Sequence, residues 1–137
     1  EMNDLWIDTY SGNYGAYMAR YVSDSTTDTE QWMITLYGFT DDETGMARVD
    51  NVYLQVDGHQ FQPLEVTTRT RQLDNEIMEV VETTYTESIF TRIANASDVR
   101  VDVGDAAFQL RNREDMRMIV QTVSSQSSQT ASNGDGQ

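Results

Sequence analysis

Two acidic loops of this chain carry the residue types that bind calcium. The first, SDSTTDTE, contains Asp24, Asp28 and Glu30, and the second, TDDETG, contains Asp41, Asp42 and Glu43. Calcium takes hard oxygen ligands of this kind. Neither loop has the D-x-[DN]-x-[DN]-G spacing of an EF-hand, and the alternative is that these acids are solvated. The sequence therefore predicts that any metal bound here is calcium, held in loops.

Two further groups of residues are suited to binding a ligand. Arg69 and Arg71 alternate along an extended segment and share one face, where two guanidinium groups would grip a carboxylate, sulfate or phosphate. The alternative is that they pair with acids of a neighbouring strand. Tyr14, Tyr17 and Tyr21 form the densest aromatic cluster and would suit a sugar or an apolar ligand. Their alternative role is packing within a sheet.

Catalytic motifs are absent from the sequence. The chain has no cysteine, which excludes thiol catalysis and zinc–thiolate sites, and it has no Gly-x-Ser-x-Gly elbow. His59, the one histidine, follows the Asp57-Gly58 pair and is either a general base or an exposed hairpin residue. Glu79 and Glu82, or alternatively Asp41, Asp42 and Glu43, are candidate acids for a carboxylate-based hydrolase. In so acidic a chain close acid pairs are unavoidable, and we expect no enzyme activity.

The charge balance limits the classes of partner. The 137 residues include 23 acidic and 9 basic ones, for a net charge of −14, and every basic residue is arginine. Such a surface repels nucleic acid and anionic membranes. The acidity is either an adaptation to high salt or a surface for calcium or a basic partner. Because the acids are dispersed and lysine is missing throughout, we favour salt adaptation.

The ends of the chain and its hydropathy suggest a location. No window approaches the roughly 18 apolar residues of a membrane span, and no signal peptide is present. The chain begins at Glu1, as an exported protein without its leader or a trimmed piece would. We expect an extracytoplasmic bacterial protein.

Two similar hairpins organise the predicted fold. Val52, Leu54 and Val56 alternate with polar residues, and Asp57-Gly58 supplies a type I′ turn. The return strand is predicted to run through Phe61 to residue 72, with Pro63 as a bulge or an edge position. The second hairpin covers residues 99–110, around Gly104-Asp105. Earlier strands are predicted at residues 5–7, 15–22 and 31–39.

Residues 74–96 are ambiguous between strand and helix. Apolar residues recur every four positions, as in a helix, but β-branched pairs lower helix propensity. We predict a strand over about 76–83 and a helix over 85–96, started by a capping box of Thr84 and Glu87. A last helix is predicted after Asn112, with Asp115 at its third position and one apolar stripe formed by Met116, Ile119, Val120 and Val123.

Together these patterns predict a mainly β fold. We expect an antiparallel β-sandwich or partly open barrel of seven to eight strands, with two short helices in the C-terminal half. Residues 1–123 would form a single domain, and residues 124–137 a flexible Ser/Gln/Gly-rich tail. The predicted function is a non-catalytic interaction or ligand-binding domain of a salt-adapted bacterium. Its partner would be a protein or a small ligand, and edge strands near Pro63 would allow self-association within a larger assembly. The alternatives are a small barrel that carries an apolar ligand and a carboxylate-based hydrolase.

Overall fold

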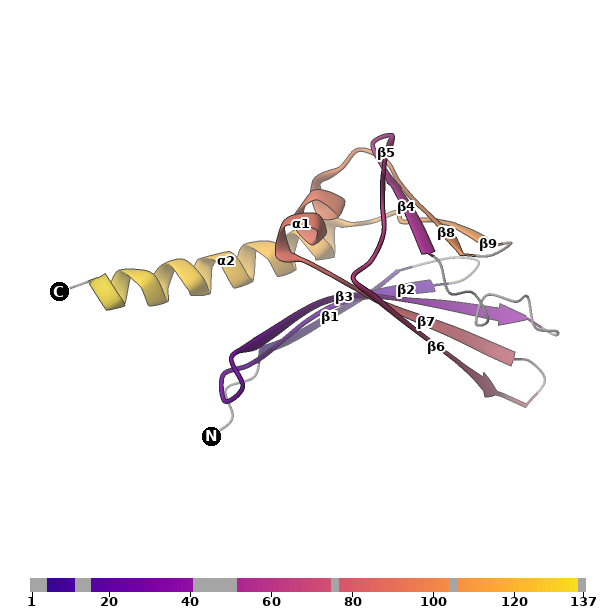
Figure 1. The fold of residues 1–137 in the computed structure, drawn as a ribbon, viewed down its shortest axis with the longest axis horizontal. Coiled ribbons are helices and arrows are strands. Elements are labelled where there is room, and N and C mark those ends of the chain that lie inside the picture. The colour runs from indigo at the N-terminus through magenta and orange to yellow at the C-terminus, as the bar shows by residue number, and fades with distance from the viewer. Residues whose placement is uncertain (1–4, 12–15, 41–51, 75–76, 104–105, 136–137) are drawn as a thin grey trace.

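The protein is built from two antiparallel sheets with two helices packed beside them (Figure 1). The computed structural model describes residues 5–11, 16–40, 52–74, 77–103 and 106–135. In these ranges the five-stranded sheet has the order β1 (Leu5–Ser11), β2 (Ala16–Asp24), β3 (Thr29–Thr40), β7 (Ile77–Tyr85) and β6 (Glu65–Gln72). The four-stranded sheet has the order β5 (His59–Phe61), β4 (Val52–Val56), β8 (Val99–Val103) and β9 (Ala106–Gln109). The helices are α1 (Glu87–Asn95) and α2 (Glu114–Asp135), so the predicted β-rich fold with helices in its C-terminal half is confirmed. Neither helix, over its described residues, is long and apolar enough to cross a membrane.

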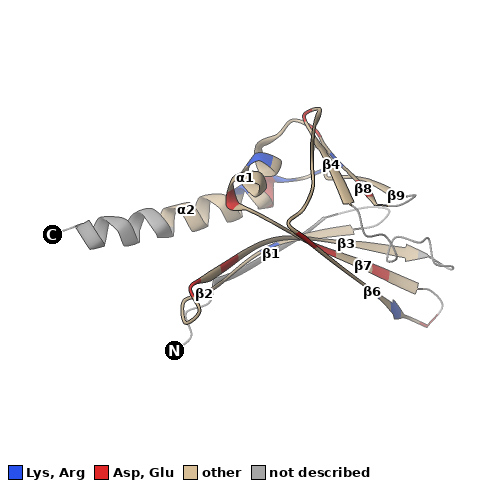
Figure 2. Cartoon of the chain, in the orientation of Figure 1, with Lys and Arg blue, Asp and Glu red and all other residues tan. Residues whose placement is uncertain are grey.

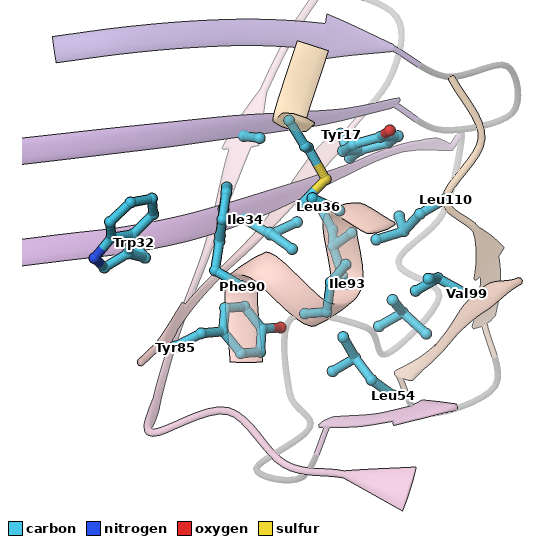
Figure 3. Packing of buried hydrophobic residues seen from close by; sticks show 14 of the residues in the cluster. Tyr17, Trp32, Ile34, Leu36, Leu54, Tyr85, Phe90, Ile93, Val99 and Leu110 are labelled. Atoms are coloured by element: carbon cyan, nitrogen blue, oxygen red, sulfur yellow. The ribbon is translucent and has the colours of Figure 1, made fainter. Parts of the chain in front are cut away.

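One hydrophobic core joins both sheets and both helices. From β2, alternate residues Tyr17 and Tyr21 enter it, as strand periodicity requires. The Trp32 ring of β3 lies 4.5 Å from the Tyr21 ring and 5.1 Å from the Phe90 ring of α1, measured between centroids. Figure 3 shows Phe90 and Ile93 of α1 between the two sheets. Helix α1 therefore fills the space that separates the sheets.

The two similar hairpins lie side by side and make up the whole four-stranded sheet. Strands β4 and β8 pair in its centre, with Leu54 opposite Val101. Asp57 and Gly58 have φ angles of 48° and 85°, which confirms the predicted turn with two positive-φ residues. The Asp57 N–H donates to the Asp98 carbonyl at 2.9 Å, which ties the first turn to the start of the second hairpin. The sequence similarity of the hairpins thus corresponds to a local two-fold arrangement.

The return strand of the first hairpin is shorter than predicted. Strand β5 ends at Phe61, and β6 begins at Glu65 in the other sheet. Pro63 lies between them, where it has no N–H to continue a ladder. The Leu64 N–H donates instead to the Thr84 carbonyl of β7 at 2.8 Å. Residues 59–72 therefore form two strands in different sheets, which brings the described total to nine.

Helix α1 begins two residues later than the predicted capping box. Its N-cap is Thr86, whose hydroxyl accepts a hydrogen bond from the Ile89 N–H at 3.2 Å. Thr84 remains in β7, paired with Met33 and Glu65 on its two sides. Strand pairing on both sides thus keeps Thr84 extended and out of the helix.

Helix α2 buries the predicted apolar stripe. Met116, Ile119 and Val123 lie in the core, and Val120 packs against it. Asn112 has a φ of 55°, and the Arg117 N–H donates to the Arg113 carbonyl at 3.1 Å. The helix therefore begins after Arg113 rather than directly after Asn112. Its backbone continues to Asp135, through residues whose composition predicted a flexible tail.

Candidate functional site

The face of the five-stranded sheet that points away from the core is apolar at its centre. We call this the outer face, and define it by the described residues of β2, β3, β7 and β6 that alternate with the core residues. Met18 of β2 lies opposite Thr35 of β3, and Tyr37 of β3 lies opposite Val80 of β7. These pairs connect the outer-face residues of the three central strands. The apolar members are Ala16, Met18, Val22, Met33, Tyr37, Phe39, Met78 and Val80.

An apolar outer face is unexpected for a sheet with one face in water. Antiparallel sheets of that kind alternate apolar and polar residues, whereas strands covered on both faces are apolar throughout. Phe39 is 43% exposed, although it is a large hydrophobic residue. Helices α1 and α2 and the four-stranded sheet all lie on the core side, and no described element covers the outer face (Figure 1). The sequence of β2, β3 and β7 is therefore that of strands with a partner on each face.

Charged residues surround this apolar centre, and their signs are balanced. The Arg69 guanidinium lies 3.2 Å from the Glu82 carboxylate, which confirms that a cross-strand acid is a partner of Arg69. Figure 2 shows acids dispersed along the strands, with basic residues near the end of β6. The described charged side chains of the outer face are Arg20, Arg69 and Arg71 together with Asp24, Glu65 and Glu82. On this face, the described charged side chains of β2, β3, β7 and β6 therefore sum to zero, in a chain of net charge −14.

Two of the three tyrosines proposed for ligand binding, Tyr17 and Tyr21, lie in the hydrophobic core. Tyr17 and Tyr21 are 4% and 3% exposed. The Tyr17 hydroxyl donates to the Arg111 carbonyl at 2.5 Å, and the Tyr21 hydroxyl donates to the Glu30 carboxylate at 2.9 Å. Burial, with help from Glu30, raises the pKa of Tyr21 to about 12. These placements favour the packing role for both residues, while Tyr14 lies outside the described residues.

The first acidic loop is the turn between β2 and β3, and the carboxylates of Asp24 and Glu30 accept hydrogen bonds within the chain. Asp24 accepts hydrogen bonds from the Thr26 hydroxyl at 2.6 Å and its N–H at 3.0 Å, and these bonds lower the pKa of Asp24. Asp28 has a φ of 54° in the turn, and Glu30 accepts from Tyr21. Among the described residues no group of three or more His, Asp or Glu side chains is placed to hold a metal. The second loop, with Asp41, Asp42 and Glu43, lies outside the described residues, so calcium binding stays a prediction.

The two glutamates of the candidate acid pair lie on opposite faces of β7, while Asp41, Asp42 and Glu43 lie outside the described residues. Glu79 faces the core side and is 1% exposed, whereas Glu82 lies on the outer face of the same strand. Carboxyl groups on opposite faces of a sheet cannot act on one scissile bond. His59 is exposed in β5. The Asp57 carboxylate accepts the N–H groups of Ser97 and Asp98, at 3.0 and 2.8 Å, and these bonds lower the pKa of Asp57.

Two arginines at the start of α2, Arg113 just before it and Arg117 in its first turn, have a role that sequence reasoning missed. Arg113 donates to the carbonyls of Ile93 and Ala96 at 3.1 and 2.7 Å, and Arg117 donates to the Ala94 carbonyl at 2.8 Å. All three carbonyls lie at the C-terminal end of α1, where the helix dipole favours cations. The C-terminal end of α1 therefore supplies hydrogen-bond acceptors for both guanidinium groups.

Known proteins add no further information about the site. Comparisons of the chain with protein-family models, with curated proteins and with solved structures find no match.

Proposed function

We propose that this chain is a non-catalytic interaction domain that binds its partner through the outer face of the five-stranded sheet. The observation that carries the proposal is the apolar centre of this face, formed by Met33, Tyr37 and Phe39 of β3 and their neighbours on β2 and β7. Apolar side chains gain free energy when they leave water, at about 25 cal/mol per Å². A partner protein packed on this face would remove these side chains from water and so gain this free energy.

The shape and composition of the face favour a macromolecular partner over a small ligand. Small ligands bind in concave pockets, whereas the described strands of this sheet present a broad surface. Interfaces between proteins have an apolar core enriched in aromatic residues and methionine, with arginine and a polar rim. Met33 and Tyr37 lie at the centre of the outer face, and Arg69 and Glu82 lie towards its β6 side. The surface thus has the composition of a protein–protein interface.

The environment in which the domain works is part of the proposal. The lysine-free composition and the net charge of −14 support a salt-adapted bacterial source. High salt screens repulsion between acidic proteins, and an apolar interface does not depend on charge attraction. We propose further that the protein acts outside the cytoplasm, which fractionation of the source cells would test.

A site-specific cross-linking experiment tests the proposed surface. The photoreactive residue p-benzoylphenylalanine is placed at position 37 on the outer face. A second protein carries it at position 118 on α2, where Met118 is 58% exposed and lies on the core side of the sheet. Each purified protein is irradiated in a high-salt extract of the source cells, and the adducts are identified by mass spectrometry. We expect one defined adduct from position 37 and none from position 118. No adduct at position 37, or the same adducts from both positions, would refute the proposal.

A further inference from the structure

We infer that the partner of the outer face is a second copy of this chain, packed face to face about a two-fold axis parallel to β3. This inference rests on the proposed function, because it names the occupant of the same surface. It draws on three properties of the face: its charge balance, its extent, and the positions of opposite charges on either side of β3.

The charge balance favours a chain that is itself acidic. A basic partner would be attracted by an acidic patch, yet the outer face has equal numbers of described arginines and acids. Two copies that each carry a charge of −14 repel one another over most of their surfaces. The outer face, whose described charges balance, is where two such chains approach at least electrostatic cost, and high salt screens the remaining repulsion.

The extent of the face matches what a stable dimer needs. The four strands that define the outer face, at a spacing of about 4.8 Å, cover roughly 19 Å, and nine residues of β2 at about 3.4 Å each cover roughly 30 Å. The flat area is therefore about 600 Å² on each copy, at the lower end of the range for standard interfaces. A standard protein interface buries about 800 Å² per partner. Face-to-face packing of two sheets at about 10 Å is also the arrangement of β-sandwiches.

The positions of the charges select the axis. Strand β3 is the middle strand, so a two-fold axis parallel to it places β2 of one copy over β7 of the other. Arg20 on β2 lies opposite Met33, and Glu82 on β7 lies opposite Thr35, so the two are only two residues apart along β3. Each Arg20 is then within reach of Glu82 of the other copy, and the contact occurs twice. An axis perpendicular to β3 within the interface would instead place β2 over β2 and β7 over β7, so that Arg20 would not lie over Glu82 of the second copy.

The middle of the interface would be self-complementary and apolar. With this axis, Met33 lies over Met33 and Tyr37 over Tyr37 of the second copy, which is the isologous contact of a two-fold dimer. Methionine is flexible and fills irregular gaps, so it suits a contact of a residue with itself. The dimer would therefore have an apolar centre and two symmetric pairs of opposite charge.

Sedimentation velocity of the full chain tests the dimer and its centre. Samples from about 5 to 500 µM are compared in 0.2 and 2 M NaCl. We expect a monomer–dimer equilibrium that shifts towards dimer at the higher salt. Met33→Glu should weaken the dimer at least tenfold, whereas the matched control Met118→Glu, on α2, should change it less than twofold. A wild-type chain that is monomeric throughout, or a dimer that Met33→Glu leaves intact, would overturn the inference.

A charge-exchange experiment tests the axis and does not depend on one variant folding well. Arg20→Glu alone places acid against Glu82 of the second copy, and Glu82→Arg alone places arginine against Arg20. Both should weaken their own dimers. An equimolar mixture restores both contacts and should form a heterodimer more tightly than either variant associates alone. A mixture that associates no better than its components would refute the axis.

The cross-linking result separates this inference from the proposed function. A position-37 adduct of twice the chain mass supports both. A defined adduct with a different molecule, from a chain that stays monomeric in the centrifuge, overturns the second copy but keeps the outer face as the binding surface. If no adduct forms at position 37, the proposed function itself fails.

Discussion

Replacement of Arg113 by methionine should destabilise the protein by about 2 to 4 kcal/mol, because this arginine connects α2 to the end of α1. Arg113 is 9% exposed and donates to two carbonyls, those of Ile93 and Ala96. Hydrogen bonds from a charged donor each contribute roughly 1.5 to 3 kcal/mol. Burial lowers the pKa of Arg113, which shows that the site disfavours the charged form, and removal of that charge offsets part of the loss. Methionine keeps most of the apolar stem.

Urea denaturation followed by tryptophan fluorescence is a suitable assay, since Trp32 is buried in the core. Arg117→Met removes one described bond, to Ala94, and should cost about 1.5 kcal/mol. Arg100→Met is an exposed control whose partner is Asp102, at 3.0 Å, and should cost less than about 0.5 kcal/mol. Because the Arg113 contacts are buried, its effect should be the same in 0.2 and 2 M NaCl. A loss below about 0.5 kcal/mol, or one that disappears in high salt, would refute the capping role.

Three further predictions concern the core, the first hairpin and the response to salt. Thr83→Val removes the hydroxyl that donates to the buried Ile34 carbonyl at 2.7 Å, and we expect a loss of about 1 kcal/mol in urea denaturation with no change in the m-value; an unchanged midpoint would contradict this. The N–H groups of Asp98 and Ser97 hold the pKa of Asp57 below its usual 3.8, so its carboxylate stabilises the fold above that pH, and the stabilisation is lost as the pH falls towards the folded-state pKa. Asp57→Asn, which tolerates the positive φ, should therefore be less stable at pH 7 and lose less stability on acidification to pH 2 than the wild type; parallel pH profiles would argue against this. Thermal melts in NaCl and CaCl₂ at matched ionic strength should have equal midpoints if the acidity is salt adaptation, whereas extra stabilisation by millimolar calcium would require a site in the folded state.

Much of the local structure follows from the sequence because its causes are local. The alternation of Val52, Leu54 and Val56 and the positive-φ preference of Asp57-Gly58 determine a hairpin without reference to the rest of the chain. The same holds for the apolar stripe of α2, since residues three and four apart share one face of a helix. Side-chain parity also separates Glu79 from Glu82, because an odd spacing along a strand reverses the face.

The partners of each element were decided only by the tertiary structure. Pro63 indicated an interruption of the return strand. That the chain then passes from the four-stranded to the five-stranded sheet depends on the pairing of β6 with β7. Arg113 and Arg117 donate to carbonyls at the end of α1 because α2 packs beside α1. These hydrogen bonds join residues about 20 positions apart in the sequence. The composition of residues 31–39 predicted a strand, whereas only the sheet order shows that one of its faces lies outside the core. Period and turn chemistry are properties of neighbouring residues, whereas the choice of partner depends on the free energy of packing the whole chain.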